Sequence, residues 1–197
     1  MNESSISKIN TDNCISSKET TQTNFNTMSD NDFQDDLKKQ IIKLIAKNLK
    51  EIIKDNILNN QMKMMQQDIL YFKMIPNISL ENYIYRIFKN TKMNISTLIL
   101  SIIYIDRFCE LNQYVISMNN IHNLLLTACL LSMKFNEDEI ISSKYYAYIA
   151  GIPVFILNNF ELYFCIKLNF SFFVEESLFQ KYYDFFCKNP NIKKKSQ

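Results

Sequence analysis

Four charged side chains in this sequence stand among apolar residues, and they are the first candidates for a function. Lys134 closes the apolar run LLLTACLLSM, and Glu161 lies within NNFELYFCIKLNF. Asp106 follows LILSIIYI, and Arg86 is one of only two arginines in a chain with twenty lysines. A charge in such surroundings costs free energy unless it is paired or reaches water. Each of the four therefore needs a partner or a path to solvent.

Arg86 and Asp106 are the first predicted pair. The planar guanidinium group of arginine matches a carboxylate better than a lysine ammonium does, which gives a reason for an arginine in this lysine-rich chain. We predict a structural ion pair between them; the alternative is that Asp106 faces solvent in the last turn of its helix. For Lys134 and Glu161, composition alone favours an ion pair on the protein's own surface. A contact with a partner protein is the alternative.

Catalysis and metal binding find little support in the residue types present. His122 is the only histidine, so sites that need several imidazoles are excluded, and no nucleophile motif accompanies it. Gly151 is the only glycine, which excludes the glycine-rich loops that bind phosphates and dinucleotides. The five cysteines include no CxxC pair and are not spaced for zinc. We expect a protein that is not an enzyme and that has no metal and no cofactor.

Charge and hydropathy give further expectations. The formal net charge is +2, so we expect no general affinity for nucleic acid. No apolar run approaches the roughly 18 residues of a membrane span, and we expect no membrane insertion. The cysteines are odd in number and three of them lie in strongly apolar segments, which indicates reduced thiols and a cytoplasmic or nuclear location.

The periodicity of apolar residues predicts an all-α fold. Residues 1–32 are polar and aperiodic, and we predict a disordered tail there. Residues 33–76 begin with a long amphipathic helix, whose apolar positions recur about every 3.6 residues up to Ile57, and end in a connector. Helices near 95–111 and 119–135 are apolar on nearly every side, so they should form the centre of a bundle. Further helices are expected near 79–91, 143–150, 153–168 and 175–187.

One stretch, YYAYIAGIPVFIL, also suits two β-strands because it is rich in aromatic and β-branched residues. Its glycine and its proline favour helices instead. A helix that ends at Gly151, followed by one with Pro153 in its first turn, places both residues where they commonly occur at helix ends. We therefore predict two helices rather than a hairpin.

The long N-terminal helix carries lysines on its polar face, at positions 38, 39, 43, 47, 50 and 54. Such a face could bind anionic lipid or calmodulin. Because lysine is abundant throughout the chain, a solvated face is the favoured interpretation. Binding to a membrane surface or to calmodulin stays an alternative.

Three motifs give the chain a family resemblance. YIDRF, LLLTACLLSMKFNED and NNFELYFCIKLNFSF occur in the order and approximate spacing of a cyclin box. The flanking ISLENYIYRIFKNTK and YYAYIAGIP resemble the P/U-type cyclins, the group that includes the phosphate-signalling cyclins of fungi and the U-type cyclins of plants. The resemblance implies a five-helix cyclin box at 77–170, an extra N-terminal helix, and a C-terminal helix and tail at 171–197. The chain has room for a single box.

The resemblance also implies a function and a site. Cyclins bind and activate cyclin-dependent protein kinases, so we expect a heterodimer with such a kinase. The family's paired lysine and glutamate match Lys134 and Glu161, which in family members contact each other and the kinase backbone. A cyclin-like scaffold that binds a partner other than a kinase is the alternative. The family's apolar contact positions match Leu131, Phe135, Cys165, Phe170 and Phe172.

Overall fold

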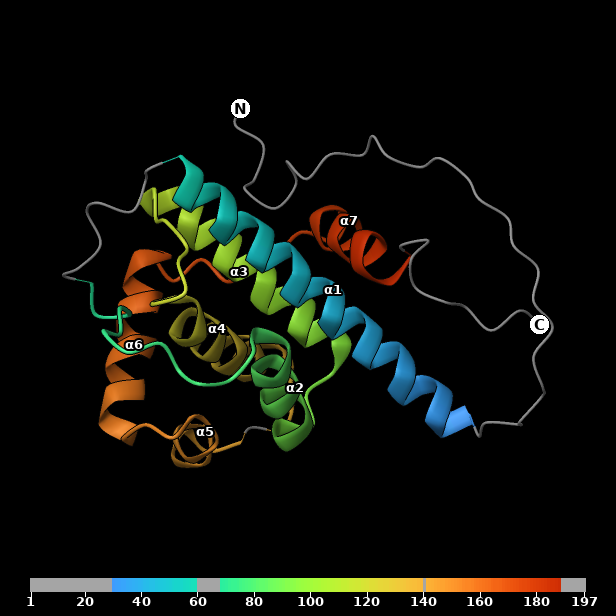
Figure 1. Ribbon diagram of the computed structural model, residues 1–197. Helices are drawn as coiled ribbons and strands as arrows, with labels where there is room; N and C mark the ends of the chain where they lie inside the picture. Colours follow the sequence, from blue (N-terminus) through green and yellow to red (C-terminus); the bar gives the residue numbers. More distant parts are fainter. Residues whose placement is uncertain (1–29, 60–67, 140, 189–197) are drawn as a thin grey trace.

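The computed structural model describes residues 30–59, 68–139 and 141–188, and this part of the chain is built from seven α-helices without a strand (Figure 1). The predicted all-α fold is therefore confirmed. The helices are α1 (Asp30–Leu58), α2 (Leu80–Thr91), α3 (Ile95–Asn112), α4 (Ile121–Asn136), α5 (Ser143–Ala150), α6 (Val154–Lys167) and α7 (Glu176–Cys187).

The two predicted tails fall mostly on residues that the structure does not describe. Of the tail predicted at 1–32, residues 1–29 lie outside the described residues, and 30–32 belong to the first turn of α1. The predicted C-terminal tail likewise lies outside them from residue 189 onward. All seven predicted helices are present, each within a few residues of its expected bounds.

Local signals set several helix boundaries. Ser79 is the N-cap of α2, and its hydroxyl accepts a hydrogen bond from the backbone N–H of Asn82 at 3.2 Å. Gly151 ends α5 with a φ of 71°, a left-handed conformation that glycine adopts without steric cost. Pro153 immediately precedes the first residue of α6 instead of lying within its first turn. The prediction of two helices in YYAYIAGIPVFIL is confirmed.

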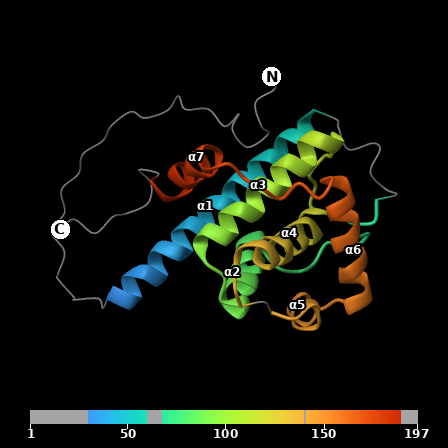
Figure 2. The same ribbon diagram turned by 180° about the vertical axis from the view of Figure 1, so that it is seen from behind.

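The helix α4 lies at the centre of the bundle, as its apolar sequence predicts. Every residue from Ile121 to Met133 is buried, and α4 packs against α2, α3, α5 and α6. Viewed from the front and from behind, α2, α3, α5 and α6 lie around it (Figures 1 and 2). A helix that is apolar on all sides is stable in water only when it is enclosed in this way. The core encloses α4 from its first residue to Met133, and the last turn of the helix reaches the surface.

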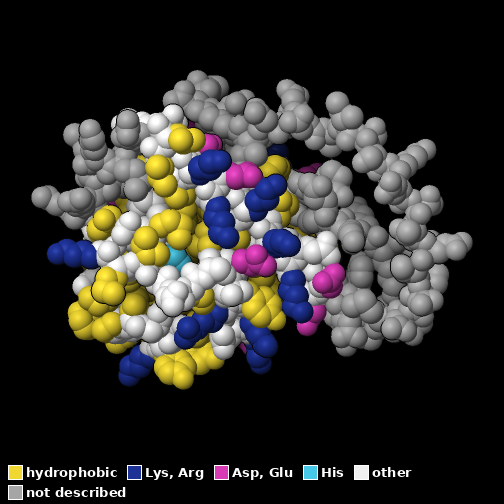
Figure 3. All heavy atoms as spheres, viewed as in Figure 1, with side chains coloured by type: hydrophobic (Ala, Val, Ile, Leu, Met, Phe, Trp, Pro, Cys, Tyr) yellow, Lys and Arg dark blue, Asp and Glu magenta, His cyan; other side chains and the backbone are white. Residues whose placement is uncertain are grey.

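The outer helices α1 and α7 cover the box from one side. α1 packs against α2 and α7, and its apolar residues Ile41, Ile45 and Leu49 are almost fully buried. Its lysines point to solvent, and Figure 3 shows cationic side chains interspersed with acidic ones on this face. The charge pattern of α1 therefore follows from its amphipathic packing.

Candidate functional site

Lys134 and Glu161 meet on the surface of the bundle. Lys134 lies in the last turn of α4, and its Nζ donates a hydrogen bond to Oε1 of Glu161 on α6 at 2.5 Å. The side chains remain 29% and 20% exposed, so the pair can be reached by a partner. A cation in the last turn of a helix also interacts favourably with the free carbonyl groups there. The structure thus joins two residues that are 27 positions apart in the chain.

Lys134 and Glu161 can each make further hydrogen bonds. An ammonium group has three N–H donors and a carboxylate has two acceptor oxygens. Within the described residues, the bond between Lys134 and Glu161 is the single hydrogen bond that either side chain makes. The remaining donors of Lys134 and the second oxygen of Glu161 are therefore available to a peptide backbone.

The apolar residues predicted for this site divide into a buried and an exposed group. Leu131 and Cys165 are 1% and 9% exposed. Each lies about one helical turn from a member of the pair, Leu131 before Lys134 and Cys165 after Glu161. Burial raises the pKa of the Cys165 thiol, and the nearby Glu161 carboxylate acts in the same direction while Lys134 opposes it. Cys165 is accordingly a neutral thiol that fills space next to the pair.

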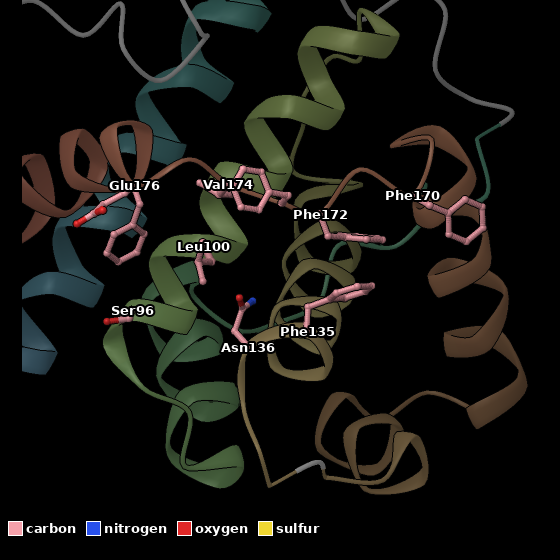
Figure 4. A pocket seen from close by; sticks show the side chains of 10 residues that line it. Ser96, Leu100, Phe135, Asn136, Phe170, Phe172, Val174 and Glu176 are labelled. Carbon is pink, nitrogen blue, oxygen red and sulfur yellow. The ribbon is translucent and has the colours of Figure 1, made fainter.

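Phe135, Phe170 and Phe172 lie near the end of α4 and in the segment after α6. The rings of Phe135 and Phe172 are stacked, with centroids 4.2 Å apart and an interplanar angle of 24° (Figure 4). Phe172 is buried by this contact, whereas Phe135 is 57% exposed. Phe170 is 64% exposed and stands apart from the stack at the end of α6 (Figure 4). The stack therefore presents one open aromatic face beside Lys134.

An aromatic groove of about 880 Å³ continues from this stack toward α7. Sequence reasoning missed this part of the surface, including Phe173, which is 80% exposed. The signal that was available is the run NFSFF directly after a predicted helix end. The residues that line the aromatic groove are Ser96, Leu100, Phe135, Asn136, Phe170, Phe172, Phe173, Val174, Glu176 and Phe179 (Figure 4).

The predicted ion pair between Arg86 and Asp106 is wrong. Arg86 is exposed on α2, and the ion pairs of the described residues do not include it. Asp106 is 3% exposed within α3, and its Oδ2 accepts a hydrogen bond from the hydroxyl of Tyr182 on α7. The physical need for a donor was identified correctly. The donor observed here is the neutral hydroxyl of Tyr182, on a helix that lies far away in the sequence.

The described residues contain no cluster of three potential metal-ligating side chains. No single helix among them is long and apolar enough to cross a membrane, and α5 and α6 reach such a length only together, across a bend of 106°.

Comparison with known proteins identifies the family. A sequence model of the cyclin family matches residues 4–172. Cyclin-U2-1 of Arabidopsis thaliana is 38% identical over 109 residues, which cover 55% of this chain and 49% of that protein. Cyclin-U4-1 of Arabidopsis thaliana is 28% identical over 156 residues, covering 78% of this chain and 77% of that protein. Cyclin-P3-1 of Oryza sativa subsp. japonica is 29% identical over 107 residues, covering 54% and 45%.

The chain spans about half the length of most of these curated relatives. The family match includes α2 to α6, which carry the central helix and the Lys134–Glu161 pair. The relatives bear the names of both U-type and P-type cyclins. This chain therefore belongs to the cyclin family, and within it to the P/U type with a single cyclin box.

Proposed function

We propose that this cyclin is a regulatory subunit that binds and activates a cyclin-dependent protein kinase. Its family supports a regulatory role. The observation that carries the proposal of a kinase contact is the pair of Lys134 and Glu161. Nζ of Lys134 lies 2.5 Å from Oε1 of Glu161 at the surface, and both side chains can make further hydrogen bonds. These two residues match the family's kinase-contacting lysine and glutamate.

The surroundings of the pair suit a protein contact. Charge-assisted hydrogen bonds are stronger than neutral ones, and they fix the register of two surfaces when water is excluded around them. The exposed ring of Phe135 and the aromatic groove beside it can exclude water in this way. Lys134 and Glu161 would then bind backbone groups of the kinase, with Phe135 and the aromatic groove providing apolar contact area nearby.

Activation follows from binding one conformation of the kinase better than the other. A protein kinase must hold its own lysine and glutamate together before it positions ATP for phosphoryl transfer. A subunit that contacts the segment next to that glutamate's helix only in the active arrangement shifts the population toward it. The cyclin supplies no catalytic group in this mechanism.

The structure weighs against binding of a membrane or calmodulin through α1. Such binding uses the apolar face of an amphipathic helix. In this protein that face is buried against α2 and α7, with Ile45 at 0% and Leu49 at 1% exposure. Only the lysine face is accessible. We therefore do not propose binding of a membrane or of calmodulin as a function of this chain.

The proposal is tested by affinity purification of the tagged chain from its native cell, followed by measurement of Kd with any recovered kinase. Lys134→Ala and Glu161→Ala should each weaken binding by about 30-fold or more, because each leaves the other charge buried without its partner in the complex. Kinase activity should fall in parallel at limiting cyclin.

A second surface ion pair provides the matched control. Nζ of Lys188, the C-cap residue of α7, lies 2.8 Å from Oδ1 of Asp184 within α7, and the two side chains are 56% and 43% exposed. Lys188→Ala and Asp184→Ala should leave the kinase Kd unchanged. Retention of the kinase by both Lys134→Ala and Glu161→Ala would overturn the proposed contact. Recovery of no kinase with the unmodified chain would overturn the proposed function.

A further inference from the structure

The aromatic segment, residues 169–174, leaves α6 in a strained conformation. Asn169 and Phe170 have φ values of 51° and 54°, in the left-handed region. L-amino acids occupy this region at a cost in free energy, and two consecutive residues there are unusual when one of them is as bulky as phenylalanine. Such a conformation persists only where the surrounding structure holds it.

Three consecutive carbonyl groups of this segment are held by side chains of α3. Nη1 of Arg107 donates hydrogen bonds to the carbonyl oxygens of Ser171 at 2.6 Å and Phe173 at 3.1 Å. The hydroxyl of Tyr104 donates to the carbonyl oxygen of Phe172 at 3.0 Å. Because Tyr104 and Arg107 are three residues apart on a helix, they project from the same face. One face of α3 thus fixes the path of the segment.

This path determines where the aromatic side chains lie. The Phe172 ring is held between Tyr104, at a centroid distance of 5.4 Å, and Phe135, at 4.2 Å. The Phe173 side chain is directed to solvent. Both residues line the aromatic groove, which is also lined by Phe135, the residue after Lys134. The shape of that groove therefore depends on the hydrogen bonds made by α3.

We propose that Arg107 is a positioning residue for the kinase contact. It acts by holding the aromatic segment in its strained conformation, so that the stack of Phe135 and Phe172 is formed before a partner arrives. Arginine suits this role because its planar, rigid group reaches two carbonyl oxygens, whereas a lysine ammonium is a point charge on a flexible stem. This inference rests on the proposed function for its effect on the kinase, but the ordering of the segment can be measured on the free chain.

The first experiment places a reporter in the segment. The chain has no tryptophan, so Phe173→Trp introduces a single tryptophan, which can be excited selectively, at a side chain that is 80% exposed. Time-resolved anisotropy of this variant should show restricted nanosecond motion. Arg107→Met and Arg107→Lys, each made in the Phe173→Trp background, should increase the amplitude of that motion at least twofold. An unchanged amplitude in both would overturn the inference, whether or not a kinase is found.

The chain's other arginine supplies the control. Arg86 is exposed on α2, so Arg86→Met changes charge and side-chain type identically and should leave the tryptophan motion unaltered. A similar increase in motion in this variant would contradict a specific role for Arg107.

The second experiment measures the kinase Kd by calorimetry in the native Phe173 background. Arg107→Met should weaken binding about tenfold, because only a fraction of molecules then holds the binding-competent conformation. Arg107→Lys should show a smaller loss, and circular dichroism should show that both variants keep the native helix content. If Arg107→Met loosens the segment and binds the kinase as tightly as the unmodified chain, the positioning role is wrong.

Discussion

Glu161 and Asp106 are carboxylates on two helices that pack together, α6 and α3, yet they have different kinds of partner. Glu161 is 20% exposed and pairs with the ammonium group of Lys134. Asp106 is 3% exposed and accepts a hydrogen bond from the neutral hydroxyl of Tyr182. The first contact lies at the protein surface, and Phe135, the residue after Lys134, lines the aromatic groove. The second joins the box to α7 in the interior.

The difference shows how the position of a charge relates to its role. A fully buried ion pair loses the hydration of both ions, and its mutual attraction often fails to compensate. A hydroxyl donor stabilises a buried carboxylate while only one ion is removed from water, which suits a structural contact. A partly exposed ion pair adds little to folding, but it offers charged donors and acceptors to a partner. We therefore expect Asp106 to matter for stability and Glu161 for binding.

The largest expected effect in the free chain is the loss of the Tyr182 hydroxyl. Tyr182→Phe removes a donor from the buried Asp106 carboxylate and should lower the free energy of unfolding by about 1–3 kcal/mol. Glu161→Gln should lower it by less than about 1 kcal/mol, because the ion pair that it removes is partly exposed. Urea denaturation followed by circular dichroism measures both.

An exposed tyrosine controls for the substitution itself. Tyr148 is 77% exposed, so Tyr148→Phe should leave the free energy of unfolding unchanged within a few tenths of a kcal/mol. If Glu161→Gln proved as destabilising as Tyr182→Phe, the surface pair would be structural as well, and the contrast between the two carboxylates would disappear.

The helices and the centre of the bundle could be predicted from the sequence because their signals are local. The run from Ile121 to Met133 is apolar on every face, and such a helix has no stable place except the core. Ser79 and Gly151 mark helix ends through their own conformational preferences. The meeting of Lys134 and Glu161 was a weaker expectation from composition, and it gained a specific role only through the family resemblance.

The remaining features depend on tertiary geometry that composition does not contain. Tyr182 reaches Asp106 across 76 residues, and nothing local distinguishes its hydroxyl from the other tyrosines of the chain. The rarity of arginine drew attention to Arg86, whereas the arginine with structural hydrogen bonds is Arg107. The aromatic groove arises where the strained segment folds back onto α3, and the helical period gives no signal for that path.

His122 is a further ionisable side chain in the interior, and it can be compared with Asp106. It is 3% exposed, and neither ring nitrogen has a hydrogen-bond partner among the described residues. Burial lowers the pKa of His122, although the nearby backbone of Ile78 and Met118 favours the charged form. Above the ordinary histidine pKa of about 6.5, His122 is neutral in both the folded and the unfolded chain. Its protonation therefore takes nothing from the free energy of unfolding in that pH range.

Below that pH the unfolded chain binds a proton more readily than the folded chain. The free energy of unfolding should therefore fall as the pH is lowered from about 7 to 5, by at most about 1.4 kcal/mol per pH unit. His122→Gln should remove this part of the slope, and denaturant titrations at a series of pH values measure it. Parallel profiles for the two proteins would show that His122 does not couple folding to pH.

The smallest expected effects come from relieving backbone strain. Two substitutions compare strain at a helix end with strain in the aromatic segment. Lys92 is the exposed C-cap of α2 with a φ of 54°, so Lys92→Gly should raise the free energy of unfolding by about 0.5–1 kcal/mol. Asn169→Gly should raise it by less, since asparagine tolerates the left-handed conformation better than lysine does. Thermal and urea denaturation rank the two variants.

The same two substitutions should differ in their effect on kinase binding, and here Asn169→Gly should have the larger effect. Lys92→Gly leaves the aromatic segment untouched, so the Kd should stay the same. Asn169→Gly adds backbone freedom two residues before the carbonyl groups that Arg107 and Tyr104 hold. This flexibility should weaken binding a few-fold even though strain is relieved. Tighter or equal binding by Asn169→Gly would mean that the conformation of the segment does not limit recognition. The strained conformation would then be a feature of the folded structure alone, as the contact of Asp106 with Tyr182 is, and would have no role in the kinase contact around Glu161.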